Sequence, residues 1–154
     1  MKKLLILAAA LIAGVAANAA SVKWSAANIY GPDATTKYTG TASLYAIIDG
    51  NATLLNTASV SAGAISATAT QFETTALTGG ETYAFYLVIE DSAGTFTSAQ
   101  VSKPIQTTST TTVGFGNMAS QTQASGAWAA VPEPTSGLLL LLGMAGLALK
   151  RKRA

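Results

Sequence analysis

The pattern of apolar and polar positions changes sharply along this chain, and its middle part is typical of β-strands. Residues 20–116 carry short runs of alternating apolar side chains separated by turn residues. The clearest run covers residues 81–90. Its apolar side chains fall on both faces: Tyr83, Phe85, Leu87 and Ile89 on one, Tyr86 and Val88 on the other. This run therefore predicts a central strand that is covered on both sides.

Turn signals divide the same region into further strands. Asp49-Gly50 between two apolar runs is a strong hairpin signal, because both residues tolerate a positive φ. The other strands expected are residues 22–30, 37–48, 52–55, 71–77, 95–102 and 110–115. The pattern predicts an all-β fold, a small immunoglobulin-like β-sandwich over residues 20–116. Residues 58–70 are compatible with a weak strand, a loop or a short helix.

Residues 117–130 lack this alternation. They are rich in Gln, Ser and Ala, which is typical of a flexible stalk. Trp128 lies near the end of this segment, and we expect it to act as an anchor at a membrane interface.

The beginning of the chain has the organisation of a secretion signal. Lys2 and Lys3 precede an unbroken apolar run over residues 4–16, and Ala17 and Ala19 then supply the small side chains that a signal peptidase requires. We expect residues 1–19 to be a signal peptide that is cut after Ala19. The alternative is a short N-terminal membrane helix, but the run is shorter than the roughly 20 residues of a spanning helix.

The end of the chain has the charge pattern of a membrane segment. Residues 137–149 are apolar and are followed by Lys150, Arg151, Lys152 and Arg153, a cluster that would stay on the cytoplasmic side. As a helix this segment spans about 20 Å. The hydrocarbon core is about 30 Å thick, so the segment suits a transient stay in the inner membrane.

Pro132, Glu133 and Pro134 stand just before this segment. The order of Pro-Glu-Pro, apolar helix and basic cluster over residues 131–154 resembles the PEP-CTERM sorting signal of Gram-negative bacteria. The resemblance implies that an exosortase, a transpeptidase-like membrane enzyme, reads this motif and removes the tail. It also implies a cell-surface or extracellular destination, with extracellular polysaccharide as a candidate partner. A simple single-pass anchor is the alternative.

Composition narrows the chemistry of the central region. The chain has no Cys and no His, which excludes Cys nucleophiles, Ser-His-Asp triads and metal sites built from these residues. Only 10% of its residues are charged. Residues 20–130 hold three lysines and six carboxylates, a net charge of −3, so no basic patch points to nucleic acid. The basic isoelectric point comes from the two ends.

The remaining candidate groups favour binding or structure over catalysis. Asp49, Glu90 and Asp91 lie at turns, where backbone roles are more common than calcium ligation. Aromatic side chains that could stack on sugar rings are Trp24, Trp128, Tyr30, Tyr38 and Tyr45. Trp24 sits in an alternating strand, which favours the core. We therefore expect a structural or adhesive matrix protein with no cofactor; the alternatives are a carbohydrate-binding module and a small hydrolase using paired carboxylates.

Overall fold

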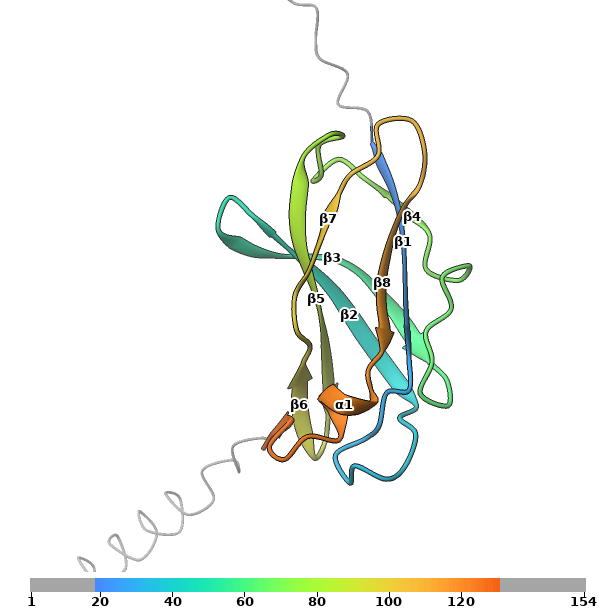
Figure 1. The fold of residues 1–154 in the computed structure, drawn as a ribbon, viewed down its shortest axis with the longest axis vertical. Helices are drawn as coiled ribbons and strands as arrows, with labels where there is room; N and C mark the ends of the chain where they lie inside the picture. The colour runs from blue at the N-terminus through green and yellow to red at the C-terminus, as the bar shows by residue number, and fades with distance from the viewer. Residues whose placement is uncertain (1–18, 131–154) are drawn as a thin grey trace, which may run out of the picture.

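The computed structural model describes residues 19–130 (Figure 1). Apart from one short helix, the regular elements are strands. In chain order they are β1 (Ala20–Ala27), β2 (Gly40–Ile48), β3 (Asn51–Val60), β4 (Phe72–Thr74), β5 (Thr82–Asp91), β6 (Gly94–Thr97), β7 (Val101–Pro104), β8 (Thr111–Asn117), α1 (Ala119–Thr122) and β9 (Trp128–Ala129). The prediction of an all-β fold is confirmed.

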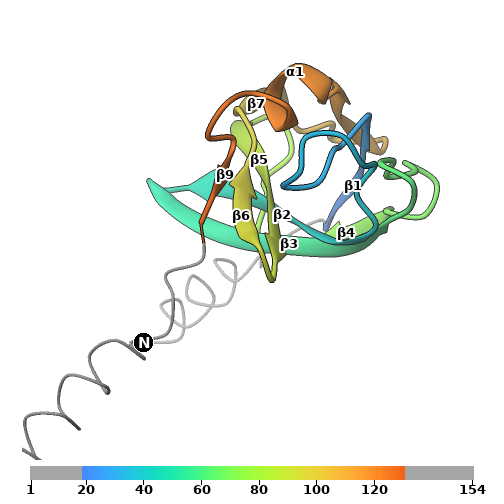
Figure 2. The same ribbon diagram turned by 90° about the horizontal axis from the view of Figure 1, so that it is seen from below.

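The strands form two sheets. The smaller sheet has the order β4-β1-β8, in which β1 is antiparallel to β4 and parallel to β8. The larger sheet has the order β3-β2-β5-β6-β9, and β7 also pairs with β5. All pairs in the larger sheet are antiparallel. Figure 2 shows the same strands from below. This order establishes the all-β class, and the immunoglobulin-like connectivity stays a prediction.

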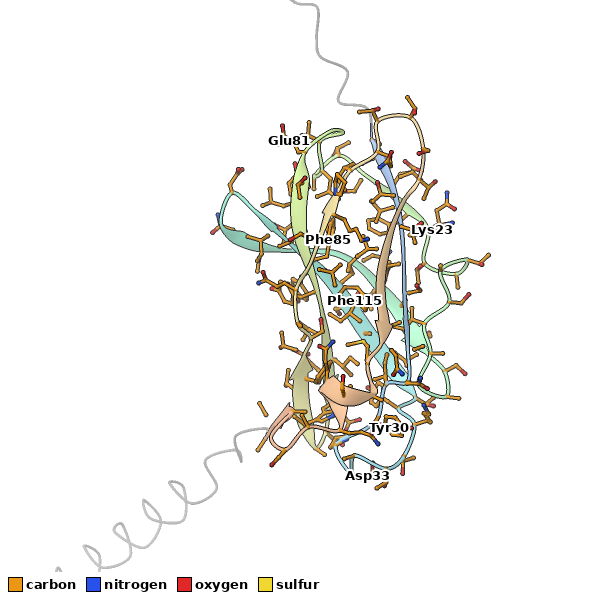
Figure 3. All side chains as sticks on the ribbon, viewed as in Figure 1. Lys23, Tyr30, Asp33, Glu81, Phe85 and Phe115 are labelled. Atoms are coloured by element: carbon orange, nitrogen blue, oxygen red, sulfur yellow. The ribbon has the colours of Figure 1, made fainter. Side chains whose placement is uncertain are left out.

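Both sheets contribute to one hydrophobic core. From the smaller sheet, Val22 and Trp24 of β1 and Val113 of β8 are fully buried. Phe85 of β5 faces them from the larger sheet, and Figure 3 shows it in the interior with Phe115. Each such side chain contributes roughly 1.5–3 kcal/mol when it is removed from water. The alternation of apolar residues in β1 and β5 therefore sets which face of each sheet turns inward.

Strand β5 is central, as its sequence predicts. It pairs with β2 on one side and with β6 and β7 on the other. The expectation that both faces are covered is wrong. Leu87 and Ile89 are buried on the inner face, whereas Tyr86 and Val88 on the outer face are only half-buried. Within residues 19–130 no further layer covers that outer face, so it is partly exposed to solvent.

Local backbone and side-chain features explain which expected strands form as predicted and which are interrupted. Asp49 and Gly50 have φ of 51° and 78°, so the predicted β2–β3 hairpin is confirmed. The expected strand over residues 95–102 is split into β6 and β7. Ser98 donates its backbone N–H to the Leu87 carbonyl at 2.9 Å, while its Oγ accepts from the Leu87 N–H at 2.9 Å. The hydroxyl thus replaces a backbone carbonyl in the ladder, and the regular pairing is interrupted.

Residues 117–130 are not the expected stalk. Met118 and Thr122 are buried, and the Met118 N–H donates to the Ala27 carbonyl at 2.8 Å. Gln121 Oε1 accepts from the Ala99 N–H at 2.8 Å, so α1 joins the smaller sheet to the β6–β7 break. This segment is polar in composition, but its side-chain amides and hydroxyls form hydrogen bonds with backbone groups of the loops that α1 covers. The segment belongs to the folded domain.

The two expected processing regions fall mostly outside the described residues. Of the signal peptide only Ala19 is described; it is exposed, and Ala20 next to it is buried in β1. The expected apolar helix over residues 137–149 lies wholly outside. Between residues 19 and 130, no helix reaches the length and apolar character that crossing a bilayer requires.

Candidate functional site

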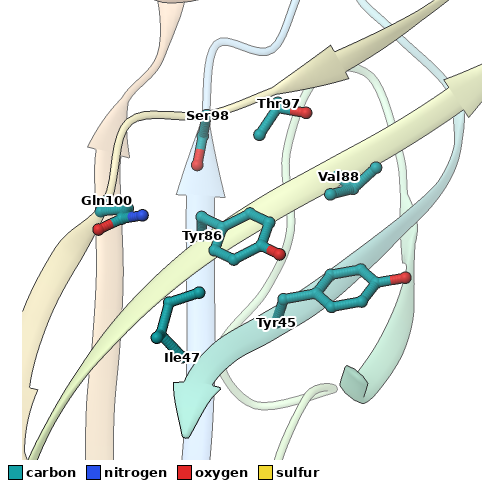
Figure 4. A pocket seen from close by; sticks show the side chains of 7 residues that line it. All are labelled: Tyr45, Ile47, Tyr86, Val88, Thr97, Ser98 and Gln100. Carbon is teal, nitrogen blue, oxygen red and sulfur yellow. The ribbon is translucent and has the colours of Figure 1, made fainter. Parts of the chain in front are cut away.

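The outer face of the larger sheet carries a shallow groove of about 530 Å³. It is lined by Tyr45, Ile47, Tyr86, Val88, Thr97, Ser98 and Gln100 (Figure 4). Tyr45 and Tyr86 are direct cross-strand partners on β2 and β5. Their rings stack with centroids 5.4 Å apart and planes 14° apart. The groove therefore has a paired aromatic floor.

Local sequence explains why these side chains gather there. The same alternation that points Leu44 and Leu87 inward points Tyr45 and Tyr86 outward. Leu54 on β3 is the cross-strand partner of Tyr45 on its other side and is 52% exposed. An apolar row therefore runs from β3 to β5 and ends at Gln100, beside the break between β6 and β7.

The groove has the chemistry of a binding surface. The polar groups of its lining are the hydroxyls of Thr97 and Ser98, the amide of Gln100 and the phenol hydroxyls of Tyr45 and Tyr86, and none of the lining residues is an Asp, Glu, Lys or Arg. Aromatic faces flanked by amides and hydroxyls suit apolar or sugar-like surfaces, since a pyranose ring presents both C–H and O–H groups. Apart from its two tyrosines, the lining contains none of the side chains that most often act as general acids or bases.

The other aromatic candidates lie elsewhere. Trp24 is 0% exposed, and its indole Nε1 donates to Asn56 Oδ1 at 3.0 Å, so the interpretation of Trp24 as a core residue is confirmed. Tyr38 is also buried. Tyr30 supports Lys37, whose Nζ lies 4.2 Å from its ring centroid. Of the five aromatic side chains proposed from the sequence to stack on sugar rings, Tyr45 alone lines the groove. Its partner Tyr86 could have been found from the outward parity of the central strand.

Within the described residues, the Trp128 side chain packs against the domain and does not project from it toward a membrane. It is half-buried in β9, opposite Phe96 of β6, with ring centroids 5.6 Å apart, and it also contacts Tyr38 at 5.7 Å. Its indole Nε1 is buried and has no hydrogen-bond partner among residues 19–130. Trp128 therefore closes the edge of the core, and the expectation of an interfacial anchor is corrected.

Of the acidic candidates, Asp49 and Asp91 serve turns, whereas Glu90 is an exposed residue of β5 opposite Thr95. Asp91 Oδ1 accepts from the Ala93 N–H at 3.0 Å in the β5–β6 turn, and Asp49 holds the positive φ of the β2–β3 turn. No three acidic residues of the described chain come together as a metal site would require. Hydrogen bonds from the Thr36 hydroxyl and from the Thr36 and Thr35 amides lower the pKa of Asp33 to about 2, which marks a tight loop.

The expected processing residues flank this domain. Ala17, Pro132, Glu133 and Pro134 lie outside the described residues, as do Lys150, Arg151, Lys152 and Arg153. Among the described residues the last one paired in a strand is Ala129, whose partner on β6 is Thr95. Only Ala130 and Val131 stand between Ala129 and Pro132. The domain therefore ends directly beside the Pro-Glu-Pro sequence.

Comparison with known proteins identifies the C-terminal region. Residues 130–153 match the PEP-CTERM protein-sorting motif, so the resemblance in the sequence is confirmed. The motif implies a protein that is exported and sorted by an exosortase to the cell surface or the extracellular space. No curated protein and no solved structure matches the chain.

Proposed function

We propose that this is a non-enzymatic surface or extracellular-matrix protein, whose β domain has a structural or adhesive role. The observation that carries the proposal is the open outer sheet face, which pairs Tyr45 with Tyr86 and whose groove is lined by no Asp, Glu, Lys or Arg. Because its apolar side chains are buried in the core, the domain would contact a partner through its surface. The sorting motif supplies the destination.

A carbohydrate-binding module is the second candidate. Stacked tyrosines with Gln100 and Thr97 beside them favour a polysaccharide as the partner. The burial of Trp24 favours the structural alternative, because the largest aromatic side chain of β1 is committed to the core. The two candidates differ in one measurable respect, which is direct affinity for a glycan.

Binding to the polysaccharide of the producing cells separates these candidates. The substitutions Tyr45→Ala and Tyr86→Ala remove the aromatic floor without opening the core. Tyr30→Ala is the matched control, because Tyr30 lies in the connection between β1 and β2 and does not line the groove. If the groove binds sugar, we expect about fivefold weaker retention for each groove variant, since a stacking contact contributes about 1 kcal/mol. Equal, weak retention of all proteins would leave the structural role.

Export and sorting have their own test. We propose that a signal peptidase cuts after Ala19, which would leave buried Ala20 as the first residue of β1. Bulky residues at Ala17 and Ala19 should leave uncut precursor in the inner membrane, as measured by the mass of the protein in each cell fraction.

The sorting motif is tested separately from the membrane segment. Replacing Pro132, Glu133 and Pro134 with Ala leaves hydrophobic length and basic charge unchanged. A simple single-pass anchor depends only on those two properties. Loss of the short surface form, with full-length protein in the inner membrane, supports exosortase processing; an unchanged mass and location would support the simple anchor.

A further inference from the structure

The strand next to the sorting motif is the most weakly held element of the larger sheet. β9 has two residues and two register pairs, Thr95 with Ala129 and Phe96 with Trp128 (Figure 2). By contrast, α1 and the residue after it are bonded to two separate loops, the β1–β2 connection and the break between β6 and β7. Thr122 Oγ1 accepts from the Tyr30 N–H at 3.1 Å, and Gln123 Nε2 donates to the Ala34 carbonyl at 2.8 Å. If the C-terminal segment opens, it opens between Gln123 and Ala129.

The docked position of Trp128 has one favourable contribution, from its ring contacts, and one unfavourable contribution, from its indole N–H. Its ring contacts Phe96 and Tyr38, which stabilises the docked strand. Its buried indole N–H lacks a partner within residues 19–130, and an unpaired buried donor opposes docking. An element held by two register pairs that also buries an unpaired donor has the features of elements that can open locally before a domain unfolds.

Docking limits how far the sorting motif stands from the domain. With β9 docked, three residue steps separate Ala129 from Pro132, about 10 Å at full extension. With β9 released, the last tied residue is Gln123, and nine steps allow about 30 Å. A membrane enzyme must surround an extended segment on both sides of the bond it cuts, so the docked domain obstructs its approach.

We propose that β9 is a docking strand that controls access to the sorting motif, so that exosortase processing requires β9 to leave β6. The inference rests on the exosortase sorting implied by the motif. It is independent of what the groove binds. The wild-type chain in the same cells reports whether processing occurs at all, so failure of this proposal is distinguishable from failure of the sorting assignment.

A reversible cross-link tests the proposal directly. Thr95 and Ala129 are opposite one another in an antiparallel pair, where Cα atoms lie within the range that a disulfide bridges. The chain has no Cys, so Thr95→Cys with Ala129→Cys can form this one bridge after export. We expect pulse-chase labelling to show loss of the shortened form and accumulation of full-length protein. A reductant should restore processing, and each single Cys variant should behave as wild type.

A second variant is designed to release β9 without a substitution in β9 itself. A Cβ at Gly94 would lie 2.9 Å from the Ala129 carbonyl oxygen and 3.4 Å from Trp128 Cβ. Gly94→Ala should therefore undock β9 and speed processing several-fold. Gly114→Ala is the matched control, because its Cβ would meet only Ser25 Oγ at 4.0 Å.

The outcomes decide the proposal in each case. Processing of the cross-linked chain at the wild-type rate would overturn it. If thiol alkylation shows that the bridge has not formed, Gly94→Ala decides: faster processing supports release of β9, and an unchanged or slower rate overturns it.

Discussion

The regions around Trp24 and Trp128 use the same side chain in opposite ways. Trp24 lies in the middle of β1, between β4 and β8, with its indole N–H bonded to Asn56. Its backbone is also fixed, because Thr70 Oγ1 accepts from the Trp24 N–H at 3.0 Å and is buried with it. Trp128 closes a two-residue edge strand, and its indole N–H has no partner in the described chain.

The two tryptophans differ in whether the indole N–H has a hydrogen-bond partner as much as in how deeply the ring is buried. A buried donor without a partner costs about 1–3 kcal/mol, whereas a hydrogen-bonded one contributes about 1 kcal/mol. The Trp24 region therefore anchors the fold, and the Trp128 region can open at a small cost. An edge that opens is useful only next to a segment that another molecule must reach, and the sorting motif begins at residue 130.

The largest effect is expected from Trp24→Ala. Deleting a fully buried Trp removes its packing, leaves a cavity and unpairs Asn56, which should lower the free energy of unfolding by about 3–5 kcal/mol. Residues 20–130 produced alone, unfolded in urea and followed by circular dichroism, give the measurement. A loss no greater than that of Trp128→Ala would break the distinction between the two regions.

Asn56→Ala isolates the polar part of the difference. It leaves the Trp24 ring in place and orphans its indole N–H, so the two tryptophans become alike in this respect. We expect a loss of about 1–3 kcal/mol in the free energy of unfolding. Thr57→Ala, at the next and exposed position on β3, is the control and should change stability by less than about 0.5 kcal/mol.

Alternation predicted the strands and the core well, because inward parity in β1 and β5 is a local property of the sequence. Asp49-Gly50 likewise predicted its hairpin through backbone preference alone. Residues 117–130 were predicted wrongly as a stalk, because composition does not show that Thr122 and Gln121 bond to distant loops. The splitting of β6 from β7 depends on one Ser98 hydroxyl, which periodicity cannot indicate.

Only one of the two tyrosines in the groove was predicted from the sequence as a binding residue, and the reason is related. Tyr45 was a candidate by residue type, and Tyr86 was assigned to a covered face. Whether an outer face is covered depends on how many layers the domain has, and that is a property of the whole fold. The sorting motif, by contrast, is a continuous local sequence and was predicted from its order alone.

Trp128→Ala should have a smaller and more local effect than either change near Trp24. Its ring is half-buried, and removing it also removes the orphaned donor, so we expect a loss of about 1–2 kcal/mol. Hydrogen exchange should accelerate in β6 and β9 and stay unchanged in β1. Faster exchange in β1 to the same degree would contradict an independently opening edge.

The smallest effect is expected from acid, and it acts on the side of the molecule that holds α1. Hydrogen bonds to Asp33, first from the Thr36 hydroxyl, lower its pKa from 3.8 to about 2. The folded pKa lies below the unfolded one, so the stabilisation is present above about pH 3.8 and is lost as the pH falls through about 2. Protonation should loosen the loop around Ala34, to which Gln123 is bonded. The contacts of Trp24 with Asn56 and Thr70 contain no titrating group.

Amide protection factors between pH 4 and pH 2 measure this difference. Protection of the Thr35 and Thr36 amides, which both donate to Asp33 Oδ1, should fall, while protection of the Trp24 amide stays constant. Asp33→Asn is the matched control, because the amide oxygen still accepts these bonds and no longer titrates. The variant should keep its protection down to pH 2. A parallel loss at Trp24 would mean that acid unfolds the whole domain and that the two regions are not separable in this way.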